Sequence, residues 1–436
     1  MSAGQDLYRK AKRRIPGGTQ LLSKRPEMFL PGGWPSYYRQ ARGIEVVDLD
    51  GRRYRDFSLM GIGACILGYA DPVVDEAVMR VVRDGVMSTL NPPEEVELAD
   101  LLCELHPWAG MARFARGGGE AMSVAVRIAR ARTGRDGIAF SGYHGWTDWY
   151  LAANLADEAA LDGHLLPGLD PAGVPRGLQG TSFPFHYNRI EELKKIVDDH
   201  RGELAAIVME PQRDQHPVPG FLEEVRDIAT AIGAVLVFDE ISIGFRRNTG
   251  GVHLLFGVEP DMAIFAKALA NGYAMSAVIG REDVMQAAQS TFISSTNWTE
   301  RIGPAAAVAT IRRHRDESVP AHLESVGQRV LTGWQEAADR VGLPVDAHGM
   351  PCLPHFRFEG EDELALNTLF TQVMLEKGYL AWNQFKPSLA HGAGEVEEYL
   401  RAVEESFAVL AEAAASGHAA DLLKGGPARR GFYRLT

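Results

Sequence analysis

The sequence predicts an α/β protein with a large, mostly parallel sheet and a smaller C-terminal domain of mixed α+β structure. Between residues 72 and 320, short apolar runs alternate with amphipathic helical stretches. The runs that indicate strands are GIAF (137–140), AAIVM (205–209), AVLVF (234–238) and MAIF (262–265). Continuous Val, Ile and Ala runs suit parallel strands that are covered on both faces. Alternation of such strands with helices is typical of an α/β domain with right-handed crossovers.

The rest of the chain predicts a shorter N-terminal segment and a C-terminal domain. Residues 1–71 form the N-terminal segment, and the alternating stretch 43–57, centred on an Asp-Gly pair, predicts a β-hairpin. Residues 72–320 are the predicted large α/β domain, and residues 321–436 the small α+β domain. The clearest helix of the small domain is 395–415, which has an apolar stripe at helical spacing.

Charge and cysteine content exclude several classes of protein. The chain has 45 Lys and Arg against 57 Asp and Glu, a net charge of −12, which does not favour nucleic acid as a partner. No apolar run approaches the roughly 20 residues that a membrane span needs, and the polar N-terminus is unlike a secretory signal. Cys65, Cys103 and Cys352 are set far apart, so neither a disulfide framework nor a metal site is predicted. We therefore expect a cytoplasmic protein.

Two charged residues follow apolar runs where parallel strands are expected to end. Ligands of open α/β sheets lie at this edge, so the polar residues there are candidates for a site. Asp239 follows the run 234–238, and an acidic side chain there needs a positive partner. Lys267 follows the run 262–265, where loss of hydration would lower its pKa and make it a nucleophile for an aldehyde. Alone, Lys267 is more simply a surface lysine; the pair, 28 residues apart, indicates neighbouring strands and one shared ring.

Two glycines and an aromatic residue upstream are further candidates for the same site. Gly118 and Gly119 open a predicted helix, where backbone N–H groups and the helix dipole favour an anion. Tyr143 follows the run 137–140 and could cover a flat ring, although a packed core tyrosine is the alternative. An anion cradle, an aromatic plate, a carboxylate and a lysine together suit pyridoxal phosphate, whose protonated ring is an electron sink.

With these residues in place, the sequence resembles the class III aminotransferases, and more narrowly the glutamate-1-semialdehyde aminomutase branch, over nearly its whole length. The matching segments are IPGG (15–18), DLDG (48–51), LGYADP (67–72), EVELADLL (95–102), GGEAMSVAVRIARARTGRD (118–136), YHGW (143–146), MEP (209–211), FDEISIGFR (238–246) and FAKALANG (265–272). The resemblance implies the fold type I of pyridoxal-phosphate enzymes, as in aspartate aminotransferase. It also implies that Lys267 forms the Schiff base and moves the proton between substrate and cofactor carbons.

The resemblance implies contacts for the ring and for the phosphate of the cofactor. Tyr143 would stack on the pyridine ring with His144 beside it, and Ile241 would pack on the opposite face. Glu210 would lie near the cofactor hydroxyl, and Asp239 would pair with the pyridine nitrogen.

The phosphate would be held by the backbone amides of Gly118 and Gly119. Thr296 would reach the phosphate of the neighbouring subunit, which implies a homodimer with shared active sites. Two segments depart from the family here: Gly117–Gly119 replaces the usual Ser-Gly-Thr, and Thr299–Arg301 replaces Gly-Asn-Pro.

The substrate side departs further from the family. Lys24 or Arg25 would replace the arginine that holds the substrate carboxylate, and Lys386 stands where the aminomutase has its gating glutamate. Arg213 lies in a changed loop after the family's Glu-Pro. These four cations predict an anionic substrate, a carboxylate or a phosphate, with solvated surface cations as the equal alternative. For Arg246 a structural ion pair is favoured over contact with substrate.

The favoured function is a pyridoxal-phosphate-dependent aminotransferase that moves an amino group from a donor to a small ketone or aldehyde. An aminomutase or epimerase on the same scaffold is the alternative, although loss of the gating glutamate argues against a mutase. A non-enzymatic relative is disfavoured by retention of Asp239, Lys267 and Tyr143 together. A nucleotide-dependent dehydrogenase is disfavoured because no G-x-G-x-x-G follows the first strand of the α/β region.

Overall fold

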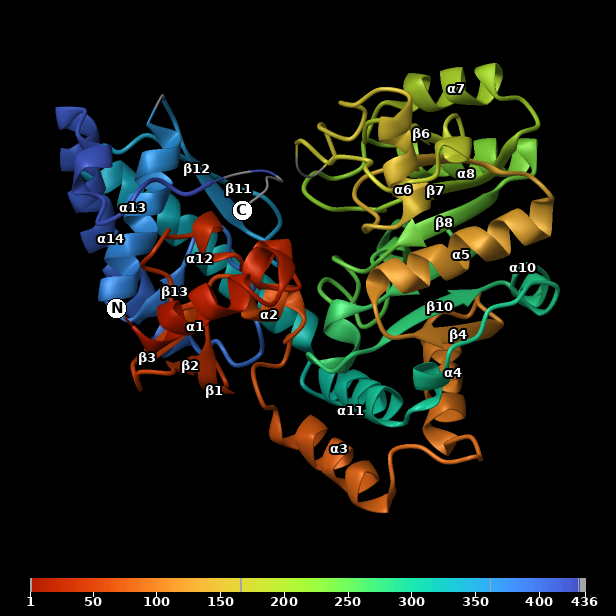
Figure 1. Cartoon of the computed structure of the whole chain (residues 1–436), viewed down its shortest axis with the longest axis horizontal. Coiled ribbons are helices and arrows are strands. Elements are labelled where there is room, and N and C mark those ends of the chain that lie inside the picture. The colour runs from red at the N-terminus through yellow and green to blue at the C-terminus, as the bar shows by residue number, and fades with distance from the viewer. Residues whose placement is uncertain (1, 165–166, 361, 430, 432–436) are drawn as a thin grey trace. The chain divides into compact units, whose positions relative to one another are not determined.

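The computed structural model describes residues 2–164, 167–360, 362–429 and 431. Their contacts divide the chain into two units. Unit 2 is Pro72–Glu317, and unit 1 combines residues 1–71 with residues 318–436. The predicted α/β class is confirmed, because unit 2 is built on a large, mostly parallel sheet (Figure 1).

The sheet of unit 2 has the strand order β4-β10-β9-β8-β7-β5-β6. Its strands are β4 (Met111–Ala115), β5 (Gly137–Ser141), β6 (Ser182–Pro184), β7 (Leu204–Met209), β8 (Val235–Asp239), β9 (Met262–Phe265) and β10 (Ser276–Gly280). Strand β10 is antiparallel to β4 and β9, and the remaining pairs are parallel. The four strands predicted from apolar runs are β5, β7, β8 and β9. Strands β8 and β9 are parallel neighbours, with Val237 opposite Met262, as the Asp–Lys spacing predicted.

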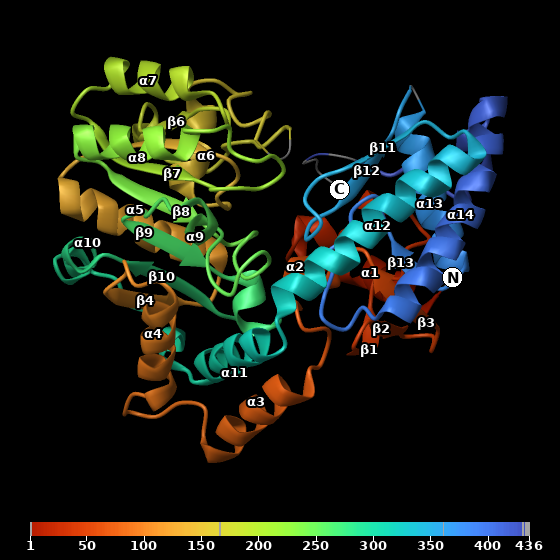
Figure 2. The same cartoon turned by 180° about the vertical axis from the view of Figure 1, so that it is seen from behind.

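Alternate residues of the parallel strands face two hydrophobic cores. In β7, Ala206 and Val208 belong to the core with α5 (Gly118–Thr133). Their neighbours Ile207 and Met209 belong to the core with α8 (Phe221–Ile232). The two helices cover opposite faces of the sheet (Figures 1 and 2). Burial on both faces explains why these strands have continuous apolar runs rather than alternating ones.

Helix α5 begins at the glycines because the side chain of Glu120 caps its first turn. The Glu120 carboxylate accepts hydrogen bonds from the backbone N–H of Gly117 at 2.9 Å and of Arg116 at 3.1 Å. The helix ends at Gly134, whose φ of 68° suits a left-handed C-cap. The other α-helices of unit 2 are α3 (Pro72–Asp84), α4 (Pro93–Leu105), α6 (Asp148–Leu151), α7 (Ile190–Asp199), α9 (His253–Phe256), α10 (Glu282–Met285) and α11 (Ile302–Asp316).

Unit 1 contains a four-stranded sheet of order β1-β2-β3-β13 and the two-stranded sheet β11-β12. Its strands are β1 (Tyr38–Arg42), β2 (Glu45–Asp48), β3 (Arg53–Phe57), β11 (Val345–His348), β12 (His355–Phe358) and β13 (Tyr379–Ala381). Strands β2 and β3 form the predicted hairpin, and β13 pairs with β3 in parallel. The helices are α1 (Ala3–Lys12), α2 (Met60–Gly63), α12 (Val319–Val341), α13 (Glu363–Glu376) and α14 (Ala393–Ser416). Trp334, Phe356 and Phe407 lie in the core of this unit.

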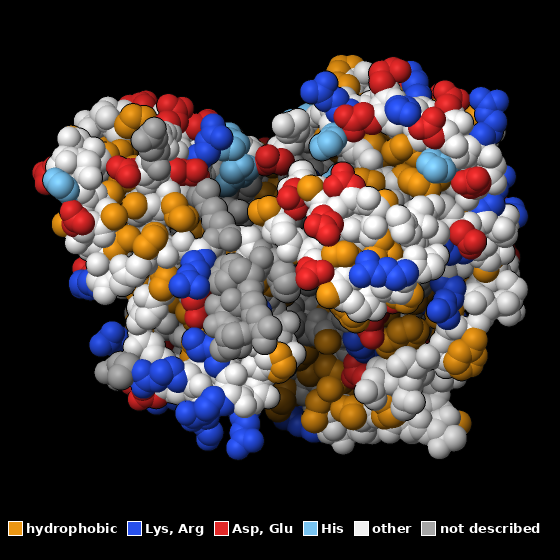
Figure 3. Space-filling view, turned by 45° about the horizontal axis from the view of Figure 1, so that its top comes forward, with side chains coloured by type: hydrophobic (Ala, Val, Ile, Leu, Met, Phe, Trp, Pro, Cys, Tyr) orange, Lys and Arg blue, Asp and Glu red, His pale blue; other side chains and the backbone are white. Residues whose placement is uncertain are grey.

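The surface carries both signs of charge. On the face shown in Figure 3, acidic and basic side chains are interspersed over unit 2, on the right of the view. Interspersed charges are the arrangement of an ordinary solvated surface. Among the described residues, no helix has the length and apolar character that crossing a bilayer requires.

Candidate active site

The carboxyl ends of two adjacent parallel strands bring an acid and a lysine together. Asp239 is the last residue of β8, and Lys267 lies two residues beyond β9. The carboxylates of Asp239 and Glu210 both act on the pKa of Lys267, so both lie near its amine. Asp239 and Glu210 are 3% and 5% exposed, which is unusual for acids and indicates compensating partners.

The Lys267 side chain is partly buried, and its amine lies among charged groups. Its Nζ donates a hydrogen bond to Oγ of Ser242 at 2.6 Å. Burial lowers the pKa of Lys267 to about 8, against the opposite pull of Glu210 and Asp239. The φ of Lys267 is 44°, a left-handed conformation that costs a non-glycine residue energy and persists where neighbours fix it. Much more of this amine is therefore neutral near pH 7 than of a solvated lysine, as a nucleophile requires.

Asp239 is fixed by His144 and by the backbone. One carboxylate oxygen lies 2.8 Å from Nδ1 of His144, and the other accepts the N–H of Ile241 at 2.9 Å. The His144 Nε2 lies 3.0 Å from the carbonyl oxygen of Ser141. The imidazole thus lies between a carboxylate and a backbone carbonyl, which ties the Asp239 side chain to the end of β5.

The residue after Asp239 anchors the following turn in the core. The buried Glu240 carboxylate accepts the backbone N–H groups of Val252 and His253, both at 3.0 Å. It also lies 2.7 Å from Nδ1 of His253, whose Nε2 accepts a hydrogen bond from the Trp108 indole at 3.0 Å. Since Trp108 only donates, His253 carries its proton on Nδ1 and donates it to Glu240. Glu240 thus has a positioning role behind the site.

The glycines at the start of α5 leave room beside the predicted ring position. A Cβ on Gly118 would lie 3.0 Å from the Ile241 side chain, and one on Gly119 would lie 3.1 Å from Nε1 of Trp146. Tyr143 is half-buried, and its pKa is raised by burial and then by the nearby Asp239 carboxylate. An aromatic ring and an aliphatic side chain therefore lie around a cradle that a larger residue would fill, at a helix end that attracts anions.

These residues fit pyridoxal phosphate. The open helix start suits its phosphate, the half-buried aromatic ring suits its flat pyridine, and the low-pKa amine of Lys267 suits its aldehyde. The buried Asp239 carboxylate, held by His144, suits a protonated ring nitrogen. The set contains both the charges and the space that this cofactor needs.

Of the four predicted substrate cations, Arg213 is the one that the structure groups with Lys267. Its Nη1 lies 3.2 Å from a carboxylate oxygen of Glu210, and its side chain is 38% exposed. Arg213 also contributes to the lowered pKa of Lys267, which shows that the two charges are near each other. Lys24, Arg25 and Lys386 belong to unit 1.

Thr296 is exposed at the start of the short 3-10 helix Thr296–Thr299. Its carbonyl oxygen accepts a hydrogen bond from the Thr299 hydroxyl at 2.9 Å. The segment that follows is bound by Arg116, the residue just before the glycines at the start of α5.

Sequence reasoning missed the contacts of Ser242 and Arg116. Ser242 follows Asp239 by three residues on the turn after β8, which is the one sequence signal that it lies at the strand edge. The carbonyl of Ser242 also accepts a hydrogen bond from Nε of Arg246 at 2.7 Å. Arg246 is 1% exposed.

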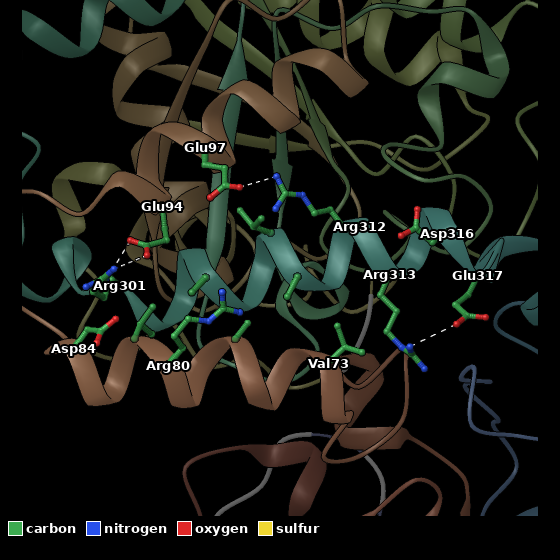
Figure 4. A pocket seen from close by; sticks show the side chains of 15 residues that line it. Val73, Arg80, Asp84, Glu94, Glu97, Arg301, Arg312, Arg313, Asp316 and Glu317 are labelled. Atoms are coloured by element: carbon green, nitrogen blue, oxygen red, sulfur yellow. Dashed lines mark hydrogen bonds and ion pairs between the residues drawn. The ribbon is translucent and has the colours of Figure 1, made fainter.

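A groove elsewhere on unit 2 is separate from these residues. It lies between α3, α4 and α11 with a volume of about 480 Å³ (Figure 4). Alanine and valine side chains line it, with the ion pairs Arg301–Glu94 and Arg312–Glu97 at its rim. None of the predicted catalytic, cofactor or substrate residues is among its lining residues.

Comparisons with known proteins agree with this geometry. The family model for class III aminotransferases matches residues 33–376. The 3-aminobutyryl-CoA aminotransferase of Cloacimonas acidaminovorans (strain Evry) is 32% identical over 93% of this chain and 98% of its own length.

Solved structures of related proteins have the same fold. The FumI protein of Sphingopyxis sp. MTA144, in its pyridoxal-phosphate internal aldimine form, matches with a TM-score of 0.85 and 26% identity over 95% of this chain and 97% of its own. A glutamate-1-semialdehyde aminomutase from Pseudomonas aeruginosa PAO1 shares the fold at 20% identity, with a TM-score of 0.78 over 93% and 94% of the two chains. The predicted fold type I and cofactor are thereby confirmed. The chain belongs to the class III aminotransferases, which use pyridoxal phosphate.

Proposed function

We propose that this aminotransferase exchanges an amino group between a free amino donor and a free ketone or aldehyde, and that a small anionic molecule is one of its substrates. The observation that carries the proposal is the desolvated Lys267 amine beside the Asp239 carboxylate at adjacent strand ends. Identity of 32% to a relative named as an aminotransferase, over nearly the whole chain, supports the exchange reaction.

Two groups of residues would hold the cofactor. The backbone N–H groups of Gly118 and Gly119 would bind its phosphate, and Tyr143 and Ile241 would lie on the two faces of its ring. The half-buried Tyr143 ring and the closeness of Ile241 to Gly118 support this arrangement. When bound, the cofactor supplies an electron sink for the negative charge that develops on the substrate carbon.

The remaining residues would manage charge and protons. Asp239, held in place by His144, would keep the ring nitrogen protonated, and Glu210 would lie on the hydroxyl side of the ring. Lys267 would hold the cofactor aldehyde and then carry the proton that leaves the substrate carbon. A pKa of about 8 suits the proton transfer, because an acid–base group works best near the operating pH. The Ser242 hydroxyl, 2.6 Å from Nζ, would orient the released amine.

Arg213 would bind the anionic group of a substrate. Its partly exposed guanidinium is held by Glu210 through Nη1, which leaves further donors for a carboxylate or phosphate. Lys24, Arg25 and Lys386 stay proposed for the substrate side on the resemblance alone.

We propose that the protein is a homodimer with shared active sites, to which Thr296 contributes from the neighbouring subunit. Residues 73–96 carry a series of exposed large apolar side chains, of which Leu90 is 81% exposed. A segment of this kind is typical of a surface that a partner covers. It lies next to the segment after Thr296, because the carbonyl of Val86 accepts the N–H of Arg301 at 3.1 Å.

The cytoplasm is the proposed location, inferred from the three widely spaced cysteines of the sequence. Fractionation of the source cells tests it. Recovery of the mature protein in an exported fraction would contradict it.

The exchange reaction predicts two separable half-reactions. Protein loaded with pyridoxal phosphate should lose its visible absorption band when one amino donor from a panel is added alone, and a keto acceptor should restore it. Lys267→Ala should lower kcat by about 10²- to 10⁴-fold, because it removes the acid–base group. Stopped-flow absorbance and steady-state rates measure both effects.

The exposed Lys195, which pairs with Asp199 on α7, provides the matched control. Lys195→Ala should keep the wild-type rate. Full activity in Lys267→Ala would contradict the mechanism, and isomerisation of a single substrate without a free oxo product would establish the aminomutase or epimerase alternative.

If Arg213 binds the anionic group of a substrate, its replacement should weaken the binding of charged substrates selectively. Arg213→Gln should raise KM for carboxylate-bearing donors by about ten- to a hundredfold, the loss expected for charge-assisted hydrogen bonds, while KM for neutral amines stays within about twofold. The exposed Arg176 of the same unit is the control, and Arg176→Gln should change neither constant. Equal losses with charged and neutral donors would show that Arg213 supports the cofactor rather than the substrate.

The dimer predicts that a charge at position 90 weakens self-association. Leu90→Arg should raise the dimer dissociation constant at least about tenfold in analytical ultracentrifugation, because an unpaired cation is costly to bury. Val409→Arg, at a 41% exposed position of α14, should leave it unchanged. A wild-type monomer with full activity would rule out a shared site.

A further inference from the structure

We infer that Arg116 and Glu300 are positioning residues that hold the glycine segment of the phosphate site against the segment following Thr296, and so set the affinity for the cofactor phosphate. The inference rests on the cofactor site proposed above. It goes beyond that site by assigning a role to two charged residues that contact neither the catalytic lysine nor Asp239 through any hydrogen bond found among the described residues.

The Arg116 guanidinium binds the second segment at three points. Nε forms an ion pair with the Glu300 carboxylate at 2.9 Å. Nη2 donates to the carbonyl oxygens of Trp298 at 3.0 Å and of Glu300 at 2.7 Å. The side chains of the pair are 14% and 20% exposed, so solvent screens them less than an ordinary surface pair. The planar fork of arginine suits this geometry, which a lysine ammonium cannot reproduce.

Both ends of this link are anchored in regular structure. The Glu300 carboxylate accepts the N–H of Ile302 at 2.8 Å and of Gly303 at 3.2 Å, which caps the start of α11. On the other side, the hydroxyl of Ser276 in β10 donates to the carbonyl of Gly117 at 3.1 Å. The pair therefore connects the N-terminus of α5 to the N-terminus of α11.

The two linked segments are the ones where the sequence departs from the family pattern. Gly117–Gly119 lacks the usual serine and threonine, and Thr299–Arg301 replaces Gly-Asn-Pro. Three consecutive glycines have more backbone freedom than Ser-Gly-Thr, so ordering their N–H groups around an anion costs more entropy. The Arg116–Glu300 ion pair fixes the residue just before the glycines, which reduces this entropic cost before the anion binds. The charged pair thus supplies order that the glycines lack.

A neighbouring ion pair provides a matched control. Arg301 pairs with Glu94 at 2.6 Å, with side chains 21% and 15% exposed, and lies one residue after Glu300. It connects the start of α11 to α4 at the rim of the groove, rather than to the glycine segment (Figure 4). The two pairs are alike in burial and chemistry but differ in what they hold.

The test compares Arg116→Lys and Glu300→Gln with Arg301→Lys by titrating each apo-protein with pyridoxal phosphate and, separately, with unphosphorylated pyridoxal. Arg116→Lys and Glu300→Gln should raise the dissociation constant of pyridoxal phosphate about tenfold, the size of one charge-assisted hydrogen bond. Arg301→Lys should change it less than twofold. No variant should change the affinity for pyridoxal, which lacks the phosphate.

Apo-protein melting temperatures and circular dichroism show whether each variant is folded, and Glu300→Gln is the conservative check if Arg116→Lys is not. Unchanged affinity for pyridoxal phosphate in both Arg116→Lys and Glu300→Gln would overturn the inference. So would an equal loss of affinity for pyridoxal, or an equal loss in Arg301→Lys, because each would indicate a general structural role. Failure of the wild-type protein to bind pyridoxal phosphate would instead contradict the cofactor site itself.

Discussion

The removal of the Lys267 amine from water is the constraint on which the site depends. Burial alone would favour the neutral amine, whereas Asp239 and Glu210 pull the pKa upward and would hold the ammonium form. Arg246 and Arg213 push it down again, in the same direction as burial. The result is a pKa of about 8, with burial as the largest influence and the two arginines acting in the same direction.

The turn after β8 carries two of these charges, Asp239 and Arg246, on one short stretch of chain, whereas Glu210 and Arg213 follow β7. The Asp239 carboxylate accepts the N–H of Ile241, which fixes the acid at the start of the turn. Ser242 then offers its hydroxyl to Lys267 on one side and its carbonyl to Arg246 on the other. The same turn therefore positions Lys267 at the site and the buried Arg246 side chain. A shift of this turn would disturb both residues.

The fold and the closeness of Asp239 to Lys267 could be predicted from sequence because the responsible signals are local. Strands buried on both faces leave continuous apolar runs, and the residues after them mark the edge of the sheet, which is how Asp239 and Lys267 were found. Pairings between distant segments leave no such pattern. The parallel pairing of β3 with β13 joins residues about 320 positions apart, and the link from Arg116 to Glu300 joins residues 184 positions apart. Only the folded chain brings them together. Ser242 was missed because a serine in a turn has many ordinary uses.

Mapping the lysine that binds the cofactor tests the central claim most directly. The protein is incubated with pyridoxal phosphate, reduced with borohydride, digested, and analysed by mass spectrometry. A desolvated amine at the end of β9 predicts one dominant phosphopyridoxyl adduct, on the peptide that contains Lys267, which forms faster as the pH rises through about 8. An adduct on a different lysine, or modification spread over surface lysines without preference, would contradict it.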